Sequence, residues 1–198
     1  PVLDFRFSDP PRSTQVMKRA MDLLVSAGLL LLLSPLLVGI ALAILLDTGR
    51  PVLFRQRRAG QDGEPFTMMK FRTMVADAEE RLADLVDLAA LDQPAFKIPD
   101  DPRITRTGRF LRRTSLDELP QLFNVLLGEM SLVGPRPPLP GEVEGYDLWH
   151  RRRLSMKPGI TGLWQVRARR EPEFDRWVAA DLEYIDRWSL WLDIEILA

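Results

Sequence analysis

Residues 114–121 read Thr-Ser-Leu-Asp-Glu-Leu-Pro-Gln and lie between a run of arginines and a proline-rich turn. Ser115 followed three residues later by Glu118 has the pattern of a capping box, which predicts a helix over residues 116–127. Asp117 and Glu118 then fall in the first helical turn, where free backbone N–H groups favour negative charge. Acidic residues at this position commonly serve as capping devices, so spacing alone leaves a purely structural role open.

A group of arginines precedes these two carboxylates. They are spaced mostly by three residues, so they would form a slowly winding ridge if the segment is helical. A ridge of this kind is commonly a solvated face. Next to paired acids it also fits a site for a multiply charged phosphate ester, because guanidinium groups bind phosphate oxygens in pairs. The group consists of Arg103, Arg106, Arg109, Arg112 and Arg113.

Length and charge bound the classes of protein. The 198 residues suffice for one domain with a real core, and the net charge is -1. That charge excludes a globally basic protein, so we expect no nucleic-acid partner and an anion site made by local clustering. The chain has no cysteine, which excludes thiol chemistry and allows a reducing compartment. The single histidine, His150, lacks partners at ligand spacing and predicts no metal site.

Residues 23–46 form a run of 24 residues without a charge, which predicts a membrane segment. Ser34 and Pro35 fall at its midpoint, where proline bends a helix. Each half is about 12 residues, or ~18 Å, which is enough for one leaflet. Basic residues flank both ends, so both ends prefer the cytoplasmic side. We therefore expect a re-entrant helix-break-helix anchor, with a kinked spanning helix as the alternative.

The sequence divides into a tail or linker over residues 1–17, the re-entrant helix over 18–48 and a cytosolic catalytic domain over 49–198. Residues 51–57 and 65–71 predict a β-hairpin with its turn at 60–63. Residues 76–91 have the spacing of an amphipathic helix, and residues 142–156 are polar and helical. The predicted fold class is α+β and mainly helical, a globular domain with a small β-hairpin on an N-terminal re-entrant anchor.

Three cations outside the arginine ridge are also candidates. Lys70 and Arg72 end the second hairpin run near the membrane exit, where they could contact lipid headgroups or a substrate. Arg136 lies in Gly-Pro-Arg-Pro-Pro, residues 134–138. The prolines stiffen this turn, so Arg136 is either a preorganised phosphate contact or an incidental residue of a structural turn.

Taken together, the motifs resemble the monotopic phosphoglycosyl transferases, bacterial sugar transferases that begin exopolysaccharide, capsule or O-antigen synthesis. The likeness runs from residue 18 to the C-terminus, and six motifs in one order make it specific. Residues 96–98, 100–102 and 163–165 look more like the long-form exopolysaccharide enzymes, which carry an extra N-terminal membrane region. One departure is Ala168, where the family commonly has glycine. The six motifs are Lys18-Arg19-x-x-Asp22 and residues 70–74, 101–105, 114–124, 128–137 and 157–166.

The resemblance implies a two-step exchange at the cytoplasmic face of the bacterial inner membrane. Asp117 would attack the sugar-bearing phosphate of a UDP-sugar and expel UMP, and undecaprenyl phosphate would then take the phosphosugar. Asp117 and Glu118 would hold Mg²⁺, the expected cofactor. Membrane lipids are further partners, and a homodimer is possible. The implied phosphate and substrate contacts are Lys70, Arg72, Arg103, Arg112 and Arg136.

Two other functional classes remain. A non-catalytic module could bind anionic lipids or nucleic acid through the arginine ridge, with steep salt dependence and no need for Asp117. A membrane-anchored phosphate-ester hydrolase could use the same carboxylates with water as the acceptor. The paired acids and Arg136 argue against the first class, and the resemblance argues against the second. Nothing in the sequence distinguishes a glucose donor from a galactose donor.

Overall fold

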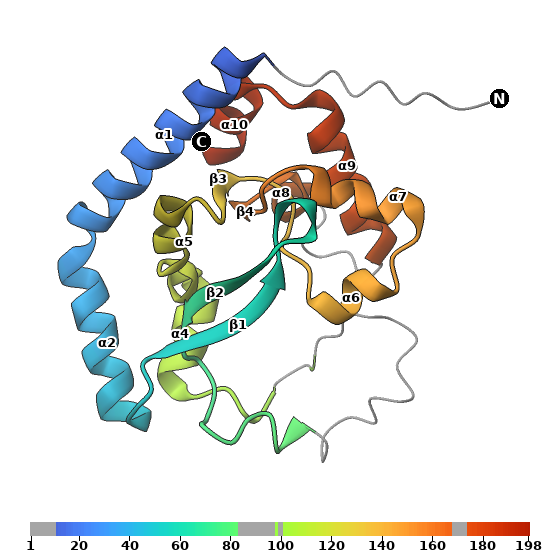
Figure 1. The fold of residues 1–198 in the computed structure, drawn as a ribbon. Helices are drawn as coiled ribbons and strands as arrows, with labels where there is room; N and C mark the ends of the chain where they lie inside the picture. Colours follow the sequence, from blue (N-terminus) through green and yellow to red (C-terminus); the bar gives the residue numbers. More distant parts are fainter. Residues whose placement is uncertain (1–10, 83–97, 99–100, 168–173) are drawn as a thin grey trace.

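The computed structural model describes residues 11–82, 98, 101–167 and 174–198. Helices dominate this part of the chain, and its strands form two small two-stranded sheets. The predicted class, α+β and mainly helical with a β-hairpin, is confirmed. In Figure 1 the first two helices form a bent arm along one side of the globular part.

The arm consists of α1 (Arg12–Leu32) and α2 (Ser34–Thr48), which meet at a bend of 61°. Pro35 lies in the first turn of α2, where its missing N–H costs no helical bond. The Ser34 hydroxyl donates to the Leu31 carbonyl at 2.8 Å and so serves the end of α1. The predicted break at Ser34 and Pro35 is confirmed, but α1 begins at Arg12, so residues 12–17 are helical and not part of a linker.

The outer face of the arm is apolar and exposed. Leu31 and Leu46 are 80% and 88% exposed. Among the described residues, no single helix is long and apolar enough to cross a membrane, and α1 and α2 satisfy that criterion only as a bent pair. A bent pair is the arrangement that a re-entrant anchor requires.

The inner face of α1 is held to the globular part by polar groups. The buried Asp22 carboxylate accepts hydrogen bonds from the Ser131 hydroxyl at 2.8 Å and the Leu132 amide at 3.1 Å. Lys18 bridges Asp22 at 3.2 Å and the fully buried Asp193 at 2.9 Å. Buried carboxylates need such partners, so these contacts fix where α1 sits on the domain.

The hairpin follows the arm. Strands β1 (Leu53–Ala59) and β2 (Pro65–Phe71) pair antiparallel, with Leu53 opposite Phe71 and Ala59 opposite Pro65. The short 3₁₀ turn η1 (Gln61–Gly63) joins them, as the glycine spacing predicts. Just beyond β2, the buried Arg72 donates to the carbonyls of Thr48, Gly49 and Arg50, at 2.9, 2.7 and 3.2 Å. Arg72 therefore binds the end of the arm to the end of the hairpin.

The helix predicted over residues 116–127 is wrong in its first part. Helix α4 (Arg106–Thr114) ends at Ser115, which has φ 57° in the left-handed region and makes no side-chain cap. A 3₁₀ turn, η3 (Leu116–Glu118), follows, and α5 (Gln121–Leu127) begins only after Pro120. The capping box does not form because Ser115 ends α4 in the left-handed region, where its side chain makes no cap, and because the Glu118 carboxylate binds Lys70 at 2.7 Å. Gly128 ends α5 as expected, at φ 87°.

Two chain segments approach so closely that only glycine fits between them. Strands β3 (Ser131–Val133) and β4 (Gly159–Thr161) pair in parallel. A Cβ added to Gly159 would lie 2.1 Å from the Gly134 nitrogen, and one added to Gly134 would lie 2.4 Å from the Lys157 carbonyl oxygen. Gly159 also donates its N–H to the Pro135 carbonyl at 2.9 Å. This contact holds the 134–138 turn rigidly in place.

Most of the remaining helices lie on the side of these strands away from the arm, and the last helix lies beside α1 (Figure 1). Residues 142–156 are helical as predicted, although in short pieces. Of the amphipathic helix predicted over 76–91, residues 76–81 are turn, Leu82 is helical, and the rest lies outside the described residues. The further elements are α6 (Pro140–Glu144), α7 (Leu148–Arg151), η4 (Arg152–Ser155), α8 (Leu163–Arg167), α9 (Phe174–Arg187) and α10 (Leu190–Leu197).

Candidate active site

Asp117 and Glu118 form the acidic centre of the site, in the 3₁₀ turn between α4 and α5. Asp117 is 9% exposed, and no side chain of the described residues donates a hydrogen bond to its carboxylate. Glu118 is only partly buried and pairs with Lys70 of β2 at 2.7 Å. Arg112, in the last turn of α4, donates to the Thr73 hydroxyl at 2.8 Å and is close enough to act on Asp117 electrostatically. A carboxylate that receives no side-chain hydrogen bond among the described residues thus lies near two cations, Lys70 and Arg112.

Burial and the neighbouring Glu118 charge raise the pKa of the Asp117 carboxyl above its usual value of 3.8, and Lys70 and Arg112 act against that rise. The dominant cause is removal of the charge from water, which penalises the ionised form. Such a carboxylate is a stronger base and a better nucleophile than a solvated one. A perturbed pKa at a buried group among charged partners is also a common mark of a functional site.

Asn124 fixes the acidic turn against the hairpin. Its side chain is fully buried, accepts from the Met69 amide at 3.1 Å and donates to the Thr67 carbonyl at 2.7 Å. These two bonds connect α5 to the exposed edge positions of β2. Because η3 directly precedes α5 and Lys70 directly follows Met69, the same contacts set the distance between Glu118 and Lys70.

Arg136 is held by buried acids on α6 and α9. Its guanidinium contacts the buried Glu142 at 3.1 Å, and its backbone N–H donates to Asp181 at 3.3 Å. Asp181 in turn binds the buried Arg153 at 2.6 Å, and Arg153 reaches the Arg136 carbonyl at 3.4 Å. The Arg136 guanidinium also lies 5.9 Å from the centre of the Trp177 ring. The 134–138 turn is therefore held by these buried contacts as well as by its prolines.

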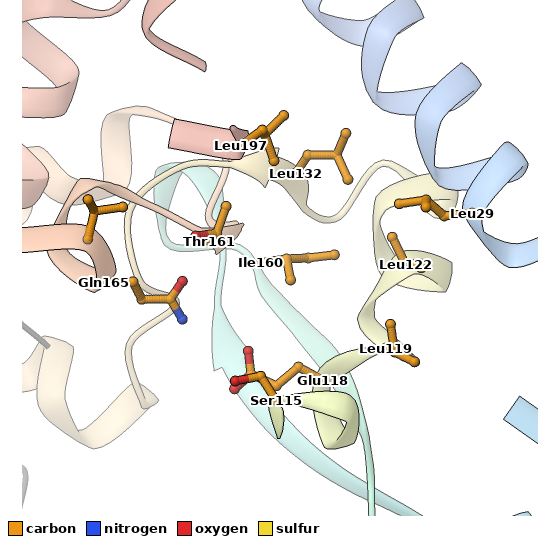
Figure 2. Close-up of a pocket in the computed structure, with 11 residues that line it drawn as sticks. Leu29, Ser115, Glu118, Leu119, Leu122, Leu132, Ile160, Thr161, Gln165 and Leu197 are labelled. Carbon is orange, nitrogen blue, oxygen red and sulfur yellow. The ribbon is translucent and has the colours of Figure 1, made fainter. Parts of the chain in front are cut away.

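A cavity of about 440 Å³ extends from the acidic turn toward the arm. Figure 2 shows Ser115 and Glu118 at one end, Ile160 in the middle, and Leu132, Leu197 and Leu29 of α1 toward the other end. Thr161, close to Leu197, and Gln165, on the side away from Leu29, add polar groups. The site therefore combines charged residues at one end with a largely apolar wall, which includes Leu29 of the arm.

Comparisons with known proteins agree on one family. The model of the family described as bacterial sugar transferase matches residues 13–198. The exopolysaccharide production protein ExoY of Rhizobium meliloti (strain 1021) is 40% identical over 184 residues, which cover 91% of this chain and 81% of that protein. The chain belongs to the bacterial sugar transferase family.

Longer relatives of this chain have more specific names. The undecaprenyl-phosphate galactose phosphotransferase of Salmonella typhimurium is 44% identical over 190 residues, which cover 94% of this chain. The UDP-glucose:undecaprenyl-phosphate glucose-1-phosphate transferase of Escherichia coli (strain K12) is 42% identical over 203 residues, which cover 96% of this chain. In both comparisons, this chain spans 40% of the length of its relative.

The structure gathers some of the sequence-predicted residues and separates others. Asp117, Glu118, Lys70 and Arg112 come together, whereas Arg136 lies in the 134–138 turn and contacts Glu142. Arg103 is buried and pairs with Asp101 at 2.7 Å, outside α4 and therefore off the predicted ridge. Arg72 binds the end of α2. We assign these last two to structural roles.

Other residues of the site escaped sequence reasoning. Asn124 lies in the quoted 114–124 motif, but sequence spacing gives no sign that its amide spans two strand residues. Asp181 and Arg153 are distant in sequence and meet only in the fold. Arg58, on β1, has no signal beyond its charge.

His150 forms a capping box with Asp147 and so has a structural role. Ala168 lies outside the described residues.

Proposed function

We propose that this chain transfers a sugar-1-phosphate from a UDP-sugar to undecaprenyl phosphate. A carboxylate oxygen of Asp117 attacks the sugar-linked phosphorus, the bond to the second phosphate breaks, and UMP leaves. An oxygen of the lipid phosphate then attacks the same phosphorus. The acyl-phosphate bond breaks, the Asp117 carboxylate is restored, and the product is a lipid diphosphate sugar. The nucleophile divides one difficult displacement into two easier ones.

The observation that carries the proposal is the state of Asp117. Its carboxylate is buried, has a raised pKa and has no side-chain hydrogen bond among the described residues. Lys70 and Arg112 lie within electrostatic reach, where they can offset the charge that the reacting phosphate brings. Phosphoryl transfer depends mainly on such charge stabilisation and alignment.

The arm and the cavity support a lipid acceptor. The cavity wall includes Leu29 of α1 and ends at Glu118, so an isoprenoid chain lying against the arm can bring its phosphate to the acidic turn. The exposed leucines of α1 and α2 would rest in lipid. On this proposal the enzyme sits on the cytoplasmic face of the bacterial inner membrane, where a soluble nucleotide sugar and a lipid phosphate both arrive. A homodimer is compatible with it but is not required.

Mg²⁺ fits the acidic turn as a bound cofactor. The described residues contain no cluster of three or more acidic or imidazole ligands. Mg²⁺ commonly uses only one or two carboxylates and takes its other ligands from substrate phosphates and water. Asp117 and Glu118 are therefore a sufficient protein contribution, and a dication would relieve the repulsion that raises the pKa of Asp117. When bound, Mg²⁺ would neutralise charge on the diphosphate.

The test is release of UMP from a panel of UDP-sugars, with undecaprenyl phosphate and Mg²⁺. Asp117→Asn is compared with Asp77→Asn, an exposed carboxylate bonded to Arg81. We expect repeated turnover that requires the lipid phosphate, since without it each enzyme can release only one UMP, and we expect Asp117→Asn to abolish release and Asp77→Asn to leave it unchanged. The UDP-sugar that supports release identifies the hexose, and both glucose and galactose occur in the names of relatives.

Each other outcome leads to a different conclusion. Turnover that survives in Asp117→Asn would refute the covalent mechanism. Sugar phosphate released into water without the lipid acceptor would favour the hydrolase. No turnover with any UDP-sugar, by folded protein in lipid, would favour the anion-binding module. In that case binding should fall steeply with salt and ignore Asp117.

A further inference from the structure

Arg58, near the end of β1, is a partly buried cation whose bonds lock it in place without neutralising it. Its Nε and Nη2 donate to Gln56 Oε1 at 3.0 and 2.6 Å, and its Nη1 donates to the Pro137 carbonyl at 3.0 Å. Both acceptors, the Gln56 side-chain oxygen and the Pro137 carbonyl, are uncharged, and among the described residues Arg58 has no other bonded partner. The guanidinium group has five N–H donors, so two remain for a ligand.

Three neighbouring cations, unlike Arg58, form ion pairs with carboxylates. Lys70 pairs with Glu118, Arg136 with Glu142, and Arg153 with Asp181, at 2.7, 3.1 and 2.6 Å. A charge removed from water without an ion pair is costly, so proteins seldom keep one that has no task. Arg58 thus differs from these three cations, and among the described residues it resembles Arg72 and Arg112, which also bind only uncharged acceptors.

Arg58 is also coupled to both parts of the site. Its bond to the Pro137 carbonyl ties it to the 134–138 turn. Burial and then repulsion from Arg136 lower the pKa of Arg58 to about 10, while Glu142 and Glu118 act in the opposite direction, so Arg58 stays protonated at neutral pH. These two acids already form ion pairs with Arg136 and Lys70, so neither neutralises Arg58.

We propose that Arg58, together with Arg136, binds the phosphate of the nucleotide that is not transferred, which leaves as part of UMP. This inference rests on the proposed function. Lys70 and Arg112 act on Asp117, where the transferred phosphorus reacts, whereas Arg58 is bonded at 3.0 Å to the carbonyl of Pro137, the residue after Arg136. A cation at that position stabilises the charge that grows on the leaving phosphate as the bond breaks.

The Gln56 and Pro137 contacts explain how the residue would work. They hold the guanidinium plane before the substrate arrives, so little side-chain entropy is lost on binding. Lysine cannot replace this geometry, because an ammonium group is a point charge without a planar pair of donors. Arg58 is accordingly a substrate-binding residue whose orientation is part of its function.

The test compares Arg58→Gln and Arg58→Lys with a control, Arg57→Gln. Arg57 is the exposed residue that precedes Arg58 on the same strand. Binding of UMP and of uridine to detergent-solubilised protein is measured without the lipid acceptor, by calorimetry or competition. We expect Arg58→Gln to weaken UMP about 10- to 100-fold, the loss of one charged hydrogen-bonded contact. Arg58→Lys should lie between Arg58→Gln and wild type, and Arg57→Gln should match wild type. Uridine, which lacks the phosphate, should bind all four proteins equally.

The outcomes separate this inference from the proposed function. If Arg58→Gln binds UMP as wild type does, or if UMP and uridine weaken together, the inference is overturned, even where wild type transfers the phosphosugar. If wild type shows no lipid-dependent transfer but its UMP binding depends on Arg58, the inference holds and the proposed function fails. If wild type binds no UMP, the inference fails.

Discussion

Asp117 illustrates at the scale of one residue how a reactive group costs stability. Its pKa is raised by burial and by Glu118, so the folded state holds its proton up to a higher pH than the unfolded state does. The free energy of unfolding therefore falls as pH rises through the window above 3.8. At neutral pH the ionised Asp117 carboxylate lowers the free energy of unfolding. The proposed chemistry needs it, because that chemistry requires a poorly solvated nucleophile.

We predict that Asp117→Asn melts above wild type at pH 7, by roughly 2–4 °C for a gain of about 1 kcal/mol in a chain of this length. The gain should shrink as pH falls toward 3.8, because the wild-type carboxyl then becomes neutral as well. Asp77→Asn is the control, since a hydrogen bond from Arg81 lowers the pKa of Asp77 and its removal should give no gain. Thermal melts at pH 7 and pH 4.5 would check this. A less stable Asp117→Asn at pH 7 would contradict it.

At the scale of elements, the contact between β3 and β4 decides where the 134–138 turn lies. We predict that Gly159→Ala is strongly destabilising, because its Cβ would fall 2.1 Å from the Gly134 backbone nitrogen and the two segments must separate. Gly28→Ala, in α1, meets nothing within 4 Å and should stabilise by about 1 kcal/mol through helix propensity alone. Denaturant unfolding in detergent measures both. Equal effects of the two substitutions would refute the close approach.

Elements were predictable from sequence where one local rule governed them. The break at Ser34 and Pro35, the hairpin and the Gly128 helix end follow from proline and glycine chemistry and are confirmed. The capping box failed because Ser115 ends α4 in a left-handed conformation and because Lys70, on β2, competes for Glu118. Spacing cannot reveal such a competitor, just as it could not reveal that Arg103 pairs with Asp101 two residues away and leaves the ridge.

At the scale of the whole molecule, the orientation of the arm can be tested because the chain has no cysteine. We predict that single cysteines at residue 12, the start of α1, and residue 55, beyond α2, react with a membrane-impermeant maleimide from the same side of a vesicle. A re-entrant arm requires this, and a kinked spanning helix would place them on opposite sides. Pro35→Ala removes the ring that favours the break and should increase the fraction of molecules labelled from opposite sides.

On the proposed function, Arg72 would give the bilayer a direct influence on catalysis. Arg72 binds the carbonyls of Thr48 and Gly49 at the end of α2, and Lys70, which pairs with Glu118, lies only two residues away, about 7 Å of extended chain. The depth of the arm in lipid would therefore set the height of the acidic turn above the headgroups, because the link between them is so short. Membrane thickness would then act as a control on rate, because a thicker or thinner bilayer would raise or lower the reacting carboxylate relative to the phosphate of its lipid acceptor.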